Sequence, residues 1–256
     1  MENKSIYFVG AGSGAEDLIT LRGHRLICQA DMIVYAGSLV NPALLRDAKE
    51  SCEIYNSAYM NLEEMIDIMI RGYEENKLVV RLQTGDTSLY GAVREQMDSL
   101  KARGIPYEVC PGVSSFCGAA AALKAEYTLP DVSQTVIITR MEGRTGVPQR
   151  EKLSLLAEHH ATMVIFLSAA LAEQVQQELL EGYEEDTSCA VVYKATWPEE
   201  KIVRGELKNL AQMIKDNKIT KTALIMVGDF LGDEYQLSKL YDKEFETAFR
   251  KGEESL

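Results

Sequence analysis

The segment Leu78–Gly91 carries the strongest indication of how this chain folds: Leu-Val-Val-Arg-Leu-Gln-Thr-Gly-Asp-Thr-Ser-Leu-Tyr-Gly. Its apolar start, residues 78–82, is typical of a strand buried on both faces of a parallel sheet. The apolar run ends at Thr84-Gly85-Asp86, and helical spacing is predicted from Leu89 to the residue before Gly104. Ligands of open α/β sheets lie outside the carboxyl ends of strands. The Gly85-Asp86 turn is therefore a candidate small-molecule site, with an ordinary strand-to-helix loop as the alternative.

The composition indicates a globular protein that does not bind nucleic acid or anionic membranes generically. The chain has 256 residues and a formal net charge of −12, with 46% hydrophobic and 26% charged residues. Such an acidic chain repels polyanions unless basic side chains gather locally. The sequence shows no apolar run of transmembrane length, and we expect no signal peptide. The five cysteines are scattered without a C-x-x-C pair, so we expect reduced thiols, no metal site and a cytoplasmic location.

Strands and helices are predicted to alternate through the first half of the chain. The expected strands are residues 5–9, 32–35, 78–82 and 105–110, and the helices between and after them include 18–29, a capped helix from Asn61 and a small-residue helix after Ser114-Ser115. This alternation predicts an α/β fold with a mostly parallel, doubly wound sheet.

The second half is predicted to form a mixed α/β domain. Strands are expected at residues 135–139, 162–167, 189–193, 201–204 and 222–227, and helices at 149–159, 170–180 and 207–217. No helix separates the strands at 189–193 and 201–204, which favours an antiparallel hairpin there. We place the domains at residues 1–125 and 126–256, joined near Leu129-Pro130-Asp131. The segment after Gly228 suggests no role.

The glycines after the first strand, Gly10-Ala11-Gly12-Ser13-Gly14-Ala15, fit the loose dinucleotide fingerprint G-x-G-x-x-G/A. A dinucleotide site also needs an acid at the end of the second strand to bind the ribose. Asp31 stands before that strand, at its wrong end. A nucleotide-dependent oxidoreductase is therefore a disfavoured alternative.

Four segments in register resemble the S-adenosylmethionine-dependent tetrapyrrole methylases. They are Val9-Gly10-Ala11-Gly12, Arg81-Leu82-x-x-Gly85-Asp86, Pro111-Gly112-Val113-Ser114-Ser115 and Thr222-Ala223-Leu224-Ile225-Met226-Val227-Gly228. No single motif is specific, but their spacing covers the chain to about residue 230. The resemblance implies two α/β domains with the cofactor in the cleft between them, and a homodimer.

Within the family, the chain is most similar to the branch that methylates carbon 11 of precorrin-4 or cobalt-precorrin-4. This similarity rests on Tyr35–Val40, Ser88–Gly91, Ser133–Ile137, Glu142–Thr145 and Val192–Pro198. In the uroporphyrinogen branch an Asp follows the matching tyrosine, and here that position is Ala36. Another position-specific precorrin or uroporphyrinogen methyltransferase and a non-catalytic tetrapyrrole carrier remain alternatives.

The resemblance also implies site residues. Contacts with S-adenosylmethionine, and with its product S-adenosylhomocysteine, would come from Gly85, Asp86, Leu89, Ser114, Ser115, Leu167, Ala195, Thr222 and Ala223. The substrate carries many carboxylates, so a basic rim of Arg81, Arg140, Arg144 and Lys194 is expected, each near the carboxyl end of a predicted strand. Tyr35 and Tyr90 are candidate catalytic residues, and Tyr90 or Phe116 could face the sulfonium.

The expected mechanism is one of positioning. A sulfonium is already electrophilic, so the protein needs to align donor and acceptor at about 3 Å and exclude water. Ser114 and Ser115 are interpreted as helix-cap and ligand donors, because no histidine accompanies them as in a hydrolase. The chain departs from the family at Gly12-Ser13-Gly14-Ala15, usually Gly-Pro-Gly-Asp, and at Thr87 and Gly146, where Pro is common; the first departure leaves the role of that loop open.

Overall fold

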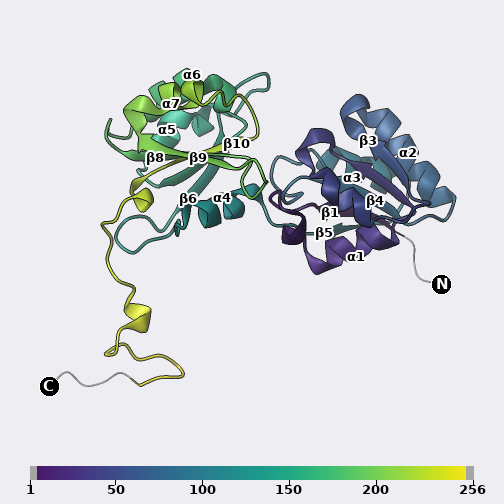
Figure 1. Ribbon diagram of the computed structural model, residues 1–256, viewed down its shortest axis with the longest axis horizontal. Helices are drawn as coiled ribbons and strands as arrows, with labels where there is room; N and C mark the ends of the chain where they lie inside the picture. The colour runs from purple at the N-terminus through teal and green to yellow at the C-terminus, as the bar shows by residue number, and fades with distance from the viewer. Residues whose placement is uncertain (1–4, 252–256) are drawn as a thin grey trace. The chain divides into compact units, whose positions relative to one another are not determined.

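The computed structural model describes residues 5–251, which group in two compact units (Figure 1). The first unit contains the chain up to Leu123 and also Val192–Lys201. The second contains Lys124–Val191 and the chain from Ile202 onward. Residues 192–201 thus belong with the first unit, although the segments on both sides of them belong to the second. Within residues 5–251, no helix is both long and apolar enough to cross a membrane.

A fully parallel five-stranded sheet forms the centre of the first unit, as predicted. Its strands lie in the order β3-β2-β4-β1-β5, and each of the four neighbouring pairs is parallel. The bounds are β1 (Ile6–Gly10), β2 (Met32–Tyr35), β3 (Glu53–Asn56), β4 (Val79–Gln83) and β5 (Tyr107–Cys110). Because all strands run the same way, the loops that follow them emerge at a single edge of the sheet.

Helices cover both faces of this sheet, which makes it doubly wound (Figure 1). These helices are α1 (Leu21–Gln29), α2 (Leu62–Glu74) and α3 (Arg94–Ala102), and a further helix, α4 (Ser115–Leu123), follows β5. Successive strand residues point to opposite faces. Phe8 and Met32 accordingly join the cluster that contains Met69 of α2, whereas Val9 and Ile33 join the opposite cluster with the α1 side chains. The predicted capping box of α2, formed by Asn61 and Glu64, is present.

The helix expected from Leu89 begins only at Arg94. Tyr90 and Ala92 have φ angles of 53° and 48°. These left-handed conformations are incompatible with a right-handed helix, so residues 86–93 form a tight loop. The apolar spacing from Leu89 misled the prediction, because Leu89 lies in the loop and Val93 is the N-cap of the helix.

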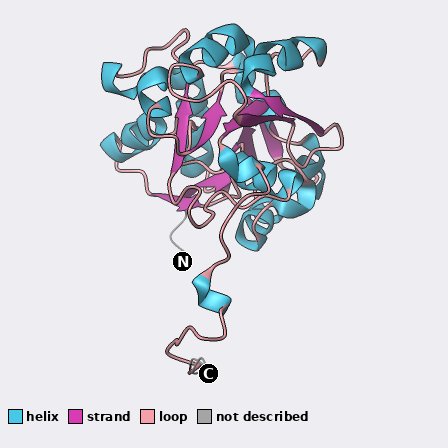
Figure 2. Ribbon diagram, turned by 90° about the vertical axis from the view of Figure 1, so that its left-hand side faces the viewer, coloured by secondary structure: helices cyan, strands magenta, loops and turns pink. Residues whose placement is uncertain are grey.

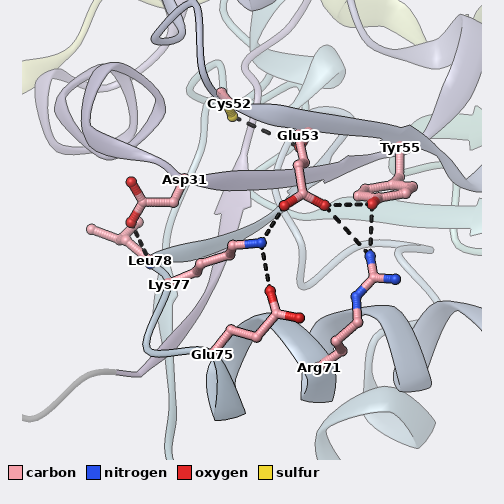
Figure 3. Close-up of polar contacts among 8 residues, drawn as sticks. All are labelled: Asp31, Cys52, Glu53, Tyr55, Arg71, Glu75, Lys77 and Leu78. Carbon is pink, nitrogen blue, oxygen red and sulfur yellow. Dashed lines mark hydrogen bonds and ion pairs between the residues drawn. The ribbon is translucent and has the colours of Figure 1, made fainter.

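The edge strand β3 is not indicated by the sequence pattern. A polar cluster on its exposed side explains why: Glu53 accepts hydrogen bonds from the Lys77 ammonium and from the Tyr55 hydroxyl, the latter at 2.6 Å (Figure 3). Arg71 of α2 donates to the Tyr55 hydroxyl at 2.6 Å and lies 3.5 Å from the Glu53 carboxylate. The hydrogen bond from Lys77, followed by that from Tyr55, lowers the pKa of Glu53. Charge pairing rather than apolar periodicity therefore marks this strand.

A second five-stranded sheet, in the order β6-β7-β10-β8-β9, forms the centre of the second unit. It is mixed, because β7 pairs in parallel with β6 and antiparallel with β10. Its strands are β6 (Val136–Arg140), β7 (Thr162–Phe166), β8 (Ser188–Tyr193), β9 (Lys201–Glu206) and β10 (Ala223–Val227).

The helices α5 (Leu153–Ala157), α6 (Ala172–Leu179) and α7 (Leu210–Asp216) pack side by side over this sheet (Figure 1). Figure 2 shows cyan helices lying outside the magenta strands. The helix predicted at 149–159 is shorter than expected. Lys152 adopts an extended conformation, with ψ at 142°, and separates a 3₁₀ turn at Gln149–Glu151 from α5.

Candidate functional site

Three glycine-bearing loops meet at the carboxyl edge of the parallel sheet, after β1, β4 and β5. A Cβ atom added to Gly10 would lie 2.6 Å from both the Gly112 Cα and the Gly85 carbonyl oxygen. Gly12 and Gly85 exchange backbone hydrogen bonds of 3.2 and 2.9 Å, and Gly85 has a φ of +60°. Because side chains would separate these backbones, the glycines allow the central loops of the sheet to contact one another.

Asp86 joins two of these loops. Its Oδ2 accepts the Gly112 N–H at 2.7 Å, and its Oδ1 accepts the Ser88 N–H at 2.9 Å and the Ser88 hydroxyl. Partial burial opposes ionisation of this carboxyl, but the hydrogen bonds from Ser88 and Gly112 outweigh burial and lower its pKa. The carboxylate is therefore charged at neutral pH and fixed between the β4 and β5 loops.

The amino end of α4 lies beside the same turn. A Cβ added to Gly85 would lie 3.6 Å from both the Ser114 Cα and the Ser115 backbone nitrogen. The Ser114 side chain is buried, and the Ser114 carbonyl accepts the Cys117 N–H at 3.0 Å. Leu89 closes the turn by donating its N–H to the Asp86 carbonyl at 3.4 Å. The fold thus brings together the predicted contacts Gly85, Asp86, Leu89, Ser114 and Ser115.

Ala195 joins this group through the segment Val192–Lys201, which belongs to the first unit. Ala195 is buried and lies between Lys194 and Thr196, whose φ angles are 47° and 66°. The Thr196 hydroxyl accepts the Ala15 N–H at 3.0 Å, next to the β1 loop. The predicted contacts of the first unit therefore come from three separate stretches of chain.

The predicted contacts of the second unit share one edge of its own sheet. The register pairs Arg140 with Phe166 in parallel and Ile165 with Ile225 in antiparallel. The end of β7, followed by Leu167, therefore lies beside the start of β10, where Thr222 and Ala223 are found.

Backbone strain accompanies these positions. Leu167 and Thr222 have φ angles of 57° and 55°, and the Leu167 side chain is 69% exposed although it is apolar. Left-handed conformations of β-branched or bulky residues cost energy and cluster at binding sites. The same feature occurs at Lys194 and Thr196 beside Ala195.

Two of the four predicted basic residues, Arg81 and Arg140, donate hydrogen bonds to groups of the fold itself. Arg81 lies in the middle of β4 rather than at its carboxyl end and is buried, and its guanidinium donates to the Gln96 Oε1 and to the Val34 carbonyl, each at 3.0 Å. Burial lowers its pKa to about 10. Arg140 donates to the carbonyls of Thr145 at 3.1 Å and Gly146 at 2.7 Å, so it shapes the 141–147 loop.

The other two basic candidates, Lys194 and Arg144, differ in their surroundings. The Lys194 ammonium lies 5.0 Å from the centre of the Trp197 ring and 3.5 Å from the Glu199 carboxylate, so it is already engaged. Arg144 is exposed in the loop that Arg140 shapes. Arg144 is therefore the rim candidate best placed to meet a carboxylate from solution.

The two tyrosine candidates stand at different places in the first unit. Tyr35 ends β2, is half-buried and packs against the core cluster that includes Val9. Tyr90 is 43% exposed in the loop after Asp86.

The geometry also bears on dinucleotide binding. Asp31 lies at the amino end of β2, where its carboxylate pairs with Lys49 at 2.8 Å and accepts the Leu78 N–H at 2.9 Å. It is therefore at the edge of the sheet opposite to the glycine loops and has no access to a ribose there. Among residues 5–251, no group of three or more His, Cys, Asp or Glu side chains is arranged to hold a metal ion.

Ser13, Ser88 and Thr196 are neighbours of the site that the sequence did not single out for a role. Ser88 follows Asp86 by two positions, a spacing typical of an Asx turn, and that signal was available. Ser13 and Thr196 are separated by 183 positions, yet their hydroxyl oxygens lie 3.0 Å apart. No local pattern announces such a pair.

Comparison with known proteins places the whole chain among related sequences and structures. The sequence model of the tetrapyrrole (corrin/porphyrin) methylase family matches residues 5–211. The cobalt-precorrin-4 C(11)-methyltransferase of Methanocaldococcus jannaschii is 55% identical over 251 residues, which cover 97% of each chain.

Solved structures agree with this result. The X-ray structure of a cobalt-precorrin-4 methyltransferase superimposes with a TM-score of 0.87 at 48% identity and covers 90% of this chain and 96% of its own. A uroporphyrin-III C-methyltransferase from Thermus thermophilus, complexed with S-adenosyl homocysteine, gives a TM-score of 0.74 at 25% identity, covering 89% of this chain and 93% of its own.

Proposed function

Since this chain belongs to the tetrapyrrole (corrin/porphyrin) methylases, we propose that it transfers a methyl group from S-adenosylmethionine to carbon 11 of precorrin-4 or cobalt-precorrin-4. The observation that carries this proposal is the identity of 55% over 97% of both chains with an enzyme of that name. The product macrocycle would be precorrin-5 or cobalt-precorrin-5, and the donor would leave as S-adenosylhomocysteine.

Two groups at the carboxyl edge of the parallel sheet support this proposal. Gly85 has no side chain, its backbone pairs with that of Gly12, and Asp86 holds a negative charge beside it. Hydroxyl and amino groups of a nucleoside and an amino acid are the partners that backbone groups and a carboxylate bind. We assign donor contacts to Gly85, Asp86, Leu89, Ser114, Ser115 and Ala195 of the first unit, and we retain Leu167, Thr222 and Ala223 of the second as further candidates.

The substrate carboxylates need cations, and we rank the predicted candidates by their burial and their partners. We assign Arg144 to substrate binding, with Arg140 holding its loop and Lys194 as a second cation. We leave Arg81 out of the rim because its guanidinium is buried under α3 with its own partners.

The proposed chemistry requires alignment rather than acid–base groups. S-adenosylmethionine supplies an electrophilic methyl group when it is bound. The chain's own loops would fix the positions of donor and acceptor and exclude water. This alignment lowers the barrier to a reaction between groups that are already reactive. Tyr35 and Tyr90 remain candidates for contacts with the reacting groups.

The test is an incubation of the protein with methyl-labelled S-adenosylmethionine and either precorrin-4 or cobalt-precorrin-4. Mass analysis is expected to show one added methyl group, and NMR of the product is expected to place the label on carbon 11. Label on another ring carbon would identify a different position-specific methyltransferase. Binding of the macrocycle without turnover would identify a carrier.

A titration separates the oxidoreductase alternative. We expect S-adenosylhomocysteine to bind and NADH not to bind, and the reverse result would refute the proposal.

We also propose a homodimer, for which light scattering should report twice 28.5 kDa. All five cysteines have free thiols, which supports a reducing cytoplasmic location.

A further inference from the structure

We propose that Thr196 is a positioning residue whose hydroxyl fastens the turn carrying Ala195 to the loop Ser13–Ala15. This inference rests on the proposed function, because its consequence is the correct placement of the donor contact at Ala195. The Thr196 hydroxyl accepts the Ala15 N–H at 3.0 Å and lies 3.0 Å from the Ser13 hydroxyl. One side chain thus joins two stretches of the chain that are more than 180 positions apart.

The turn needs such fastening because its backbone is strained. Lys194 and Thr196, on the two sides of Ala195, both have left-handed φ angles. Each such residue costs about 1 kcal/mol or more, and the conformation persists only where surrounding contacts impose it. Trp197 donates its N–H to the Lys194 carbonyl at 3.0 Å, and Thr196 donates its N–H to the Glu200 carboxylate at 2.6 Å. These bonds shape the turn internally, whereas the Thr196 hydroxyl attaches it to the β1 loop.

The β1 loop is shaped to receive the turn. Ser13 is buried, and a Cβ added to Gly14 would overlap the Trp197 ring and lie 2.7 Å from the Ala195 carbonyl oxygen. The Asn41 amide donates to the Gly14 carbonyl at 2.8 Å and supports the loop from its other side.

Helix α4 packs against the contact between the turn and the β1 loop. A Cβ added to Gly118 would lie 2.8 Å from the Ser13 Cβ and 3.1 Å from the Thr196 Cγ2. The helix that begins at Ser115 therefore packs directly on the two hydroxyl-bearing residues. Movement of Thr196 would disturb both the Ala195 backbone and the helix whose first residues are candidate donor contacts.

The test compares Thr196→Val, which keeps the shape but removes the hydroxyl, with the wild-type chain. Calorimetric titration with S-adenosylhomocysteine should show affinity about tenfold weaker, the effect of one hydrogen bond of ordinary net strength. Ser13→Ala leaves the Ala15 bond in place and should weaken affinity about threefold. Thr196→Ser should restore affinity to within about twofold of wild type, because it keeps the acceptor.

Trp197 supplies a readout that a general loss of stability would not move. It is the only tryptophan in the sequence and lies within the turn. Thr196→Val should shift its fluorescence emission and increase acrylamide quenching, while Thr187→Val, a control in a turn of the second unit, should change neither fluorescence nor affinity. An unchanged emission together with unchanged affinity in Thr196→Val would overturn the inference. A wild-type chain that binds no S-adenosylhomocysteine would instead overturn the proposed function, and with it the cofactor role of Thr196.

Discussion

Replacing Asp86 by Ala should loosen the carboxyl edge of the parallel sheet. The carboxylate accepts the Gly112 N–H at 2.7 Å and two hydrogen bonds from Ser88. Without it, the Gly112 N–H loses a charged acceptor in a crowded place where Gly10 and Gly85 leave little room for water. The loops after β4 and β5 would then lose the hydrogen bond that joins them through Asp86.

The size of the effect follows from these contacts. A hydrogen bond to a charged group contributes about 1.5–3 kcal/mol, and the Ser88 bonds are local and exposed, so they add little. We expect Asp86→Ala to lower the free energy of unfolding by about 2 kcal/mol and the Tm by roughly 4–8 °C. Ser88→Ala, the matched control, should cost less than about 0.5 kcal/mol.

The effect should also depend on pH in a defined direction. The folded-state pKa of Asp86 is lowered, so its contribution is complete above the unfolded pKa of about 3.9 and is lost as the pH falls through the folded value. The stability difference between wild type and Asp86→Ala should therefore be full at about pH 7 and should shrink below about pH 4.

Urea denaturation followed by circular dichroism at several pH values measures this difference, and calorimetry measures S-adenosylhomocysteine affinity in parallel. We expect affinity to fall along with stability, while binding of the macrocycle changes far less. Equal stability of the two proteins at neutral pH, or a difference that stays constant into acid, would refute the structural role of Asp86. Equal cofactor affinity would refute its assignment to the donor site.

Three further predictions concern charged residues. Arg144→Ala should raise the KM for the tetrapyrrole about threefold with kcat nearly unchanged, as loss of one exposed ion pair implies. Arg150→Ala, an exposed control, should leave steady-state kinetics unaltered. An equal rise in KM for both variants would show that the effect of Arg144 is nonspecific. Arg81→Met should lower the free energy of unfolding by about 2–3 kcal/mol in urea titrations because two buried acceptors lose their donor, yet leave the KM for the tetrapyrrole unchanged; a raised KM would return Arg81 to the substrate rim. Glu53→Gln should lower the urea midpoint at low salt, and the difference from wild type should shrink in about 1 M NaCl and in acid, since the Lys77 partner lowers the pKa of Glu53; insensitivity to both conditions would contradict the charge-pairing role.

Much of the fold could be predicted because the signals are local. The apolar run at Val79–Leu82 and the Asn61–Glu64 capping box lie within a few residues of the structure that they specify. Gly85 also carries its own signal, since a glycine soon after a buried strand indicates a tight turn, and its φ is +60°. The alternation of strands and helices then leads to a parallel sheet, and the motif spacing leads to the family.

Other features depended on partners that are distant in sequence. Arg81 could be read as a cation at a strand end, but its place in the middle of β4 under Gln96 makes it a buried structural residue. The edge strand β3 is marked by charge pairing with residues that follow it by about twenty positions, which no apolar period reveals. The helix expected at Leu89 failed because the loop around Asp86 imposes left-handed backbone at Tyr90.

Residue order therefore specified most of the secondary structure, the glycine turn and the family, because propensity, spacing and backbone freedom act over short stretches of chain. Which hydroxyls, carboxylates and guanidinium groups would be engaged emerged when the folded chain brought distant residues into contact. The Ser13 and Thr196 hydroxyls illustrate the difference: each is unremarkable in its own segment, and their separation of 3.0 Å exists because Val192–Lys201 packs with the first unit. Hydrogen bonds form between neighbours in space, and the sequence orders neighbours along the chain alone.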